Sequence, residues 1–130
     1  MANLSVVKVL EAGLTSSLAT CDTGGDDFRN SGIEFLRIEN THASQAYNIT
    51  VVAQTTSVKH PLYGTMSRSS VVKSISAGQT VYLGPFKQRA FNDDDQNVQL
   101  TYLTTGGAAL STVSSGVHGL KIEVLYLEQN

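Results

Sequence analysis

The residues that could carry out acid–base or nucleophilic chemistry are few and lie far apart in the chain. The three histidines, His42, His60 and His118, each fall in a predicted turn or loop, with no nucleophile motif beside them. A hydrolytic triad needs a nucleophile held against a base. Because no such nucleophile is indicated here, we expect ordinary surface histidines. The single cysteine, Cys21, precedes Asp22, whose negative charge raises the pKa of a thiol. We therefore expect a passive thiol and no enzyme active site.

The densest acidic run, Asn92-Asp93-Asp94-Asp95, is a candidate cation site. Clustered carboxylate and amide oxygens in loops bind hard cations such as calcium. The run lacks the later glycine and glutamate of an EF-hand loop. We therefore expect a solvated turn and no cofactor, although the sequence alone leaves open whether Asp93, Asp94 and Asp95 bind a cation.

Length and composition limit the kind of protein that these residues can belong to. The chain has 130 residues, which suits a single domain over 1–130. Its formal net charge of −2 excludes the broad basic excess of a protein that grips nucleic acid. A lone cysteine excludes an internal disulfide framework. With no long apolar run and no signal-peptide pattern, we expect a soluble chain that binds neither nucleic acid nor membrane.

Period-two patterns dominate the chain and predict β-strands. In residues 98–102, Val98, Leu100 and Tyr102 would share one face of a strand. Further strands are predicted over 33–38, 48–54 and 120–127, and weaker ones over 5–10, 14–20, 70–75 and 80–83. About eight short strands without a substantial helix predict an all-β, single-domain β-sandwich, either jelly-roll or immunoglobulin-like.

The segments between these strands carry further expectations. Residues 120–127 alternate and then become apolar on both faces, which predicts a central strand whose end is covered. Residues 20–32 and 55–69 are predicted to be long loops, the kind of segment in which binding contacts concentrate. Residues 76–79 are short enough for a hairpin turn, and 92–97 form a polar turn.

The segment Gly84-Pro85-Phe86-Lys87-Gln88-Arg89-Ala90-Phe91 has the most specific structural consequence. Pro85 cannot donate a ladder hydrogen bond, so the strand before it must leave its sheet or lie at an edge. A bent segment then places Phe86 and Phe91. We expect both rings to plug one end of the sandwich, with a partner-facing role as the alternative.

The stretch from Ile75 to Tyr102 resembles a recurrent pattern in small all-β virion proteins of tailed bacteriophages. Its shared features are an Ala77-Gly78-Gln79-Thr80 turn, the Gly84-Pro85-Phe86 exit and a Phe91-Asn92-Asp93 turn between two strands. The similarity extends to residues 33–54 and 119–127. It leaves out the first thirty residues, and Gln96 replaces the glycine of the commonest family turn.

This resemblance implies a structural role on the phage head. Such a protein would be a cement or decoration protein, made in the host cytoplasm, that binds the outside of the major capsid shell as a homo-oligomer. Other virion positions, such as a head-to-tail connector, tail or baseplate component, remain alternatives. From a different class, a carbohydrate-binding module would place its ligand over Tyr63, Tyr82 or Tyr102.

A polar surface with only 15% charged residues also suits assembly, because few unpaired charges lose their solvation on docking. Many copies on one lattice can then act together through multivalency. We expect the docking surface in residues 2–10, 55–69 and 87–91. The candidate interface residues are Leu4, Val6, Lys59, His60, Tyr63, Arg68, Lys87, Arg89 and Phe91.

Overall fold

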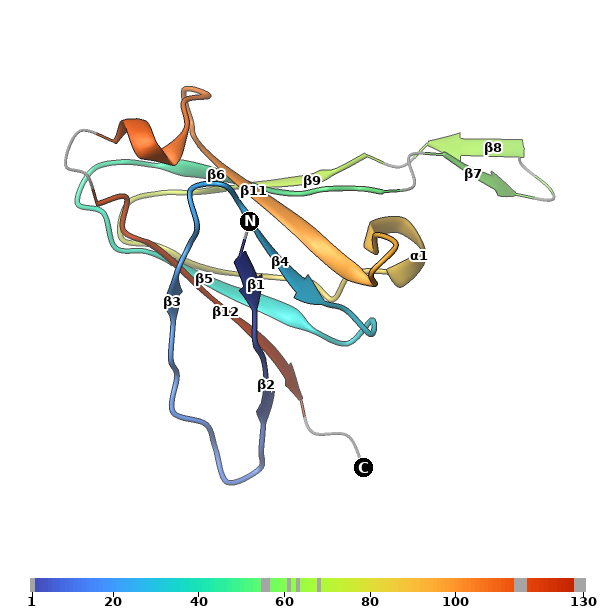
Figure 1. The fold of residues 1–130 in the computed structure, drawn as a ribbon, viewed down its shortest axis with the longest axis horizontal. Helices are drawn as coiled ribbons and strands as arrows, with labels where there is room; N and C mark the ends of the chain where they lie inside the picture. The colour runs from blue at the N-terminus through green and yellow to red at the C-terminus, as the bar shows by residue number, and fades with distance from the viewer. Residues whose placement is uncertain are drawn as a thin grey trace.

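The computed structural model describes residues 2–54, 57–60, 62, 64–67, 69–113 and 117–127. Two five-stranded sheets pack face to face, as Figure 1 shows. Sheet A has the order β1 (Ala2–Leu4), β4 (Asp26–Arg29), β11 (Asn97–Thr104), β6 (Tyr47–Val51), β9 (Val71–Ile75). Sheet B has the order β10 (Thr80–Leu83), β5 (Phe35–Asn40), β12 (Leu120–Leu127), β2 (Val6–Val9), and β3 (Ala19–Thr20) also pairs with β12. The predicted all-β sandwich is confirmed.

Four short elements of the described residues lie outside these sheets. Strands β7 (Ser57–His60) and β8 (Gly64–Ser67) form a separate hairpin. The helical elements are a four-residue helix, α1 (Gln88–Phe91), and a single 3-10 turn, η1 (Leu110–Thr112). Within the described residues no helix is long and apolar enough to cross a membrane.

The core forms where alternating side chains of the two sheets meet. Val98, Leu100 and Tyr102 all point inward from β11, as their spacing predicts. On β5 the inward apolar residues are Leu36 and Ile38, both fully buried. Each fully buried aliphatic side chain of this kind stabilises the fold by roughly 1.5–3 kcal/mol. The sandwich is therefore a rigid support for the segments at its ends.

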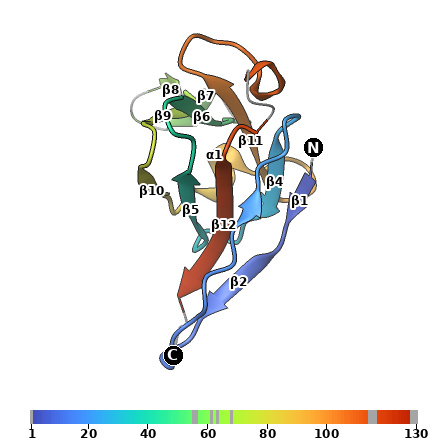
Figure 2. The same cartoon turned by 90° about the vertical axis from the view of Figure 1, so that its left-hand side faces the viewer.

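The N-terminal segment belongs to both sheets. Strand β1 pairs in parallel with β4 of sheet A, and β2 pairs in parallel with β12 of sheet B. Figure 2 shows the two strands as one continuous segment along a side of the sandwich. Residues 2–9 therefore close one edge of the molecule.

Two expectations about strands are wrong because their pairing partners are far away in the sequence. Residues 76–79 do not form a hairpin turn, since β9 pairs with β6 in sheet A and β10 pairs with β5 in sheet B. Within the predicted strand 14–20, only Ala19–Thr20 is a strand. Residues 10–17 are exposed and lie outside any strand, and we call residues 10–18 the strap.

The two predicted long loops contain regular structure. Strand β4 lies within residues 20–32, and the β7–β8 hairpin lies within residues 55–69. Strand β12 is central, as predicted, with β5 on one side and β2 and β3 on the other. Its end is covered at Leu125, whereas Leu127 is 60% exposed.

Candidate docking surfaces

One end of the sandwich is closed by two aromatic rings. Phe86 and Phe91 are buried, with their ring centroids 5.7 Å apart in an edge-on arrangement, and Phe86 also packs against Phe28. The expectation that both rings plug this end is confirmed. Phe91 must therefore be removed from the candidate interface residues, because its ring fills the core beneath α1.

Helix α1 is fixed to the sandwich by a buried asparagine. The Asn30 side-chain amide donates to the Phe86 carbonyl at 3.1 Å and to Asn92 Oδ1 at 2.7 Å. In return, the Asn30 carbonyl accepts hydrogen bonds from the side chains of Gln88 and Asn92. Four residues could not hold a helix alone, so these contacts must supply its stability. Nothing in the local pattern around Asn30 predicts this role.

The same end presents exposed basic residues beside the projecting hairpin. Lys87 and Arg89 are both exposed. The chain next to the hairpin is tied to the helix, because the Gln54 N–H donates to the Ala90 carbonyl at 2.9 Å. Figure 1 shows the β7–β8 hairpin extending from this end next to α1. Lys59 and His60 lie on β7, while Tyr63 and Arg68 lie outside the described residues.

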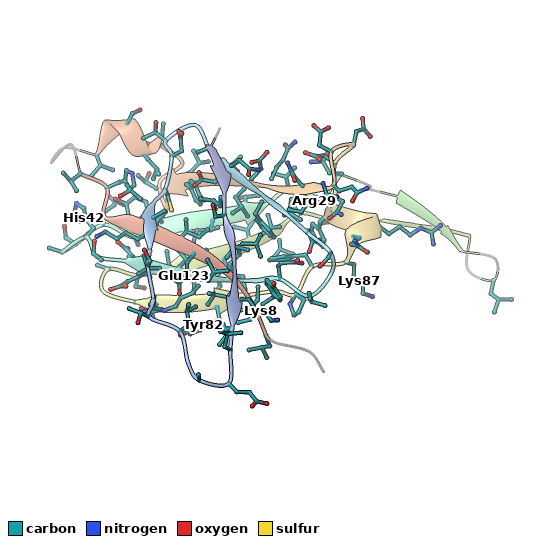
Figure 3. The ribbon with its side chains drawn as sticks, turned by 60° about the horizontal axis from the view of Figure 1, so that its bottom comes forward. Lys8, Arg29, His42, Tyr82, Lys87 and Glu123 are labelled. Carbon is teal, nitrogen blue, oxygen red and sulfur yellow. The ribbon has the colours of Figure 1, made fainter. Side chains whose placement is uncertain are left out.

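The third predicted docking segment lies elsewhere. Leu4 and Val6, on β1 and β2, are half-buried and pack against the core. Figure 3 labels Lys8 on this segment and Lys87 beside α1, on separate elements. The structure thus places the β7–β8 hairpin close to residues 87–91, an arrangement we call the helix–hairpin end, whereas β1 and β2 lie along β4 and β12.

In the acidic turn next to α1, the carboxylate of Asp93 accepts hydrogen bonds from the turn itself and from β11. Asp93 Oδ1 accepts from the N–H groups of Asp95 and Asn97, and Oδ2 accepts from the Gln99 side chain. The hydrogen bond from Asn97, followed by that from Gln99, lowers the pKa of Asp93. Among the described residues no group of three or more histidine, cysteine, aspartate or glutamate side chains could hold a metal ion.

Gln96, where the resemblance expects glycine, adopts the left-handed conformation with φ of 66°. Its side chain accepts a hydrogen bond from Arg29 Nη2 at 2.9 Å, and its carbonyl accepts from the Asn30 N–H at 3.1 Å. The turn geometry that glycine would provide is therefore kept, and neighbouring contacts offset the strain of a side chain there.

One histidine and one tyrosine lie in environments other than those predicted for them. His118 is buried, and its Nδ1 accepts the Leu120 N–H at 3.0 Å, so the expectation of a surface histidine is wrong there. Tyr102 is also buried, so its ring cannot stack on a sugar, whereas Tyr82 is 64% exposed.

The outer face of sheet A carries two rows of uncharged side chains. The pairing register places Thr101, Thr50 and Val72 in one row and Leu103, Asn48 and Ser74 in the next. Each is exposed or half-buried. A partner could cover this flat surface without removing a charge from water, which would otherwise cost several kcal/mol.

The strap is held to sheet B by the Glu123 carboxylate and by the Arg37 guanidinium, which donates to the Ser16 hydroxyl. Glu123 on β12 is nearly buried and accepts from the Ser16 hydroxyl at 2.9 Å and from the Ser17 N–H at 3.0 Å. The Arg37 guanidinium lies 3.7 Å from the same carboxylate. Figure 3 shows Glu123 between the strap and β12. Because most of the strap is exposed, these bonds should determine how often it opens.

Replacing Glu123 with alanine is therefore expected to increase the rate of thermolysin cleavage in residues 10–18 by about tenfold, since two hydrogen bonds to a charged group are lost. Mass spectrometry of the fragments checks this. Glu39→Ala is the matched control: Glu39 also lies near Arg37, at 3.9 Å, but the strap bonds described above come from Glu123 and Arg37 and not from Glu39 itself. Equal cleavage rates in the two variants would contradict the assigned role of Glu123.

Comparison of the chain with protein-family models, with curated proteins and with solved structures found no match.

Proposed function

We propose that this chain is a structural cement or decoration protein of a tailed-phage head, which binds the outside of the major capsid shell and stabilises it as a homo-oligomer. The observation that carries this proposal is the helix–hairpin end. A rigid sandwich presents there two exposed basic residues, Lys87 at the start of the fixed helix α1 and Arg89 within it, next to a hairpin that extends beyond the sheets. Such an end can contact a surface that the sandwich itself does not reach.

Two further features support the same role. The uncharged rows of sheet A offer a flat surface whose burial costs little desolvation. The strap and the hairpin leave the sandwich in different directions, as Figure 1 shows, so one copy can touch more than one neighbour. Weak contacts of this kind add up when many copies occupy one lattice.

The test is cosedimentation of the purified full chain with expanded, undecorated capsids of the phage that encodes it. The expected result is saturable binding in hundreds of copies per particle and increased resistance of the shell to heat. Protein that stays entirely in the supernatant would count against the role. Six or twelve copies in purified virions would instead identify a connector.

A charge reversal tests which end docks. Arg89→Glu is expected to lower the affinity for expanded capsids by about tenfold, because an interfacial charge of the wrong sign is repelled by its partner surface. Lys121→Glu is the matched control, since Lys121 lies on sheet B away from α1. Binding curves from cosedimentation check both variants. Equal losses, or no loss with Arg89→Glu, would exclude the helix–hairpin end.

A further inference from the structure

The interior of sheet A contains an acidic side chain that none of the surfaces described above uses. Asp26 on β4 is fully buried. The Tyr102 hydroxyl donates to Asp26 Oδ2 at 2.7 Å, and the Asp22 N–H donates to the same oxygen at 3.2 Å. Among the described residues no donor reaches Oδ1, which is also buried. A carboxylate in this position would have one oxygen that is shielded from solvent and receives no hydrogen bond from the described residues.

The surroundings of Asp26 favour its neutral form. Burial raises the pKa of this carboxyl group, and the hydrogen bonds from Tyr102 and Asp22 lower it only in part. The negative charge of Asp22 raises the pKa further, while the positive charge of the chain terminus lowers it. Cys21 and Tyr102, the other titratable side chains in contact here, have their own pKa values raised by burial and stay protonated.

The elements next to Asp26 form the free edge of sheet A. Asp26 pairs with Ala2 of β1, and the Ala2 N–H donates to the Gly25 carbonyl at 3.2 Å. The loop 21–25 closes on itself through the Gly25 N–H, which donates to the Asp22 carbonyl at 2.9 Å. Water can therefore reach Asp26 with the least disruption if β1 and this loop open together.

We propose that Asp26 is a proton-binding site inside the sandwich: its neutral acid keeps β1 and the loop 21–25 closed, and its deprotonation loosens this edge. The site contains a carboxyl group with one unpartnered oxygen, a tyrosine donor and an adjacent acidic residue, all behind a single edge strand. The N-terminal segment is thus held more firmly at acid pH than at alkaline pH.

The sign of the pH dependence follows from the direction of the shift. The folded chain binds the Asp26 proton more tightly than the unfolded chain, in which the group titrates near its ordinary value of 3.8. The stability contributed by this group is complete below that value. It falls as the pH rises, by about tenfold in the folding equilibrium constant per pH unit, until the pH passes the raised pKa.

Other carboxyl groups change the stability with pH in the opposite direction to Asp26. The pH dependence of the wild-type free energy of unfolding is therefore the sum of opposing contributions. At Glu34 burial raises the pKa, but hydrogen bonds from Ser31 and Ile33 outweigh it. The pKa values of Glu34 and Asp93 are therefore lowered, and both groups add stability as the pH rises through the acid range. The effect of Asp26 must be read from the difference between variants.

Urea denaturation of the full chain between pH 4 and pH 9 provides this difference. Asp26→Asn mimics the neutral acid and lacks the decline that Asp26 contributes, so the free energy of unfolding of the wild type is expected to fall relative to that of Asp26→Asn as the pH rises above 3.8. Asp27→Asn is the matched control, because Asp27 is the next residue on β4 and is only half-buried. Its curve should run parallel to that of the wild type. A parallel curve for Asp26→Asn as well would overturn the proposal.

Two measurements on the wild-type chain keep the test valid if Asp26→Asn does not fold. Carbon-13 NMR of the side-chain carboxyl is expected to show Asp26 titrating above 3.8, and a value at or below it would overturn the proposal. Amide hydrogen exchange, corrected for the intrinsic effect of pH, is expected to lose protection in β1 with rising pH while Ile49 in β6 keeps it. Equal losses in the two strands would also overturn it.

Discussion

Replacing Gly119 with alanine is expected to lower the free energy of unfolding by about 3–5 kcal/mol, the range of severe core substitutions. Gly119 has φ of +74°, and an added Cβ would lie 2.7 Å from the His42 backbone nitrogen and 2.9 Å from Thr41 Oγ1. These neighbours cannot move away easily. The Thr41 N–H and hydroxyl both donate to the Gly119 carbonyl, at 2.8 Å and 2.7 Å.

The control for this prediction separates the steric clash from the backbone strain. Gly107 also has a positive φ, of +88°, but an added Cβ would meet nothing within 4 Å. Gly107→Ala should therefore cost only about 1–2 kcal/mol, the strain of the left-handed conformation alone. Urea denaturation of the two variants measures both values. Equal costs would show that the region around Thr41 and His42 rearranges freely.

The sequence predicts well those strands that can be recognised from the pattern of their own residues and close neighbours. In β11 the alternation of Val98, Leu100 and Tyr102 is uninterrupted. Strand β10 has the predicted bounds, 80–83, and ends shortly before Pro85. Strand β4 escapes prediction because its Asp26-Asp27-Phe28-Arg29 sequence is typical of a loop. It is a strand because Phe28 and Asp26 point into the core opposite Val98 and Leu100 of β11. That pairing involves residues about seventy positions away, and no local pattern encodes it.

For the candidate site too, the sequence predicts local features but not contacts between distant segments. The bend after Pro85 predicts that Phe86 and Phe91 close one end of the sandwich, and they do so. The sequence does not show that the β7–β8 hairpin lies beside α1 or that residues 2–10 lie elsewhere, since tertiary packing sets these positions. The sequence also does not indicate the role of Asn30, because its side-chain amide bonds to Phe86 and Asn92, which are far away in the chain.

A second buried asparagine, Asn40, joins the two sheets at the other end of β5. Its side-chain amide donates to the Gln45 carbonyl at 2.7 Å and to the Ile75 carbonyl at 3.5 Å, and its Oδ1 accepts from the His42 N–H at 3.0 Å. Ile75 is on β9 of sheet A, whereas Asn40 ends β5 of sheet B. One side chain therefore satisfies groups from the 41–46 turn and from the facing sheet.

Asn40→Ala is expected to lower the free energy of unfolding by about 2–4 kcal/mol, because each buried polar group left without a partner costs about 1–3 kcal/mol. Asn48→Ala is the matched control: Asn48 accepts one hydrogen bond from Ser74 on the exposed face of sheet A, and its loss should cost less than about 1 kcal/mol. Urea denaturation measures both. Hydrogen exchange at His42 in Asn40→Ala then locates the loss, since faster exchange there is expected even under conditions in which the sheets stay folded. Unchanged protection at His42 would mean that water replaces the asparagine, and that the other bonds of the 41–46 turn, among them those to His42 Nδ1 from the N–H groups of Ser44 and Gln45, are enough to hold it.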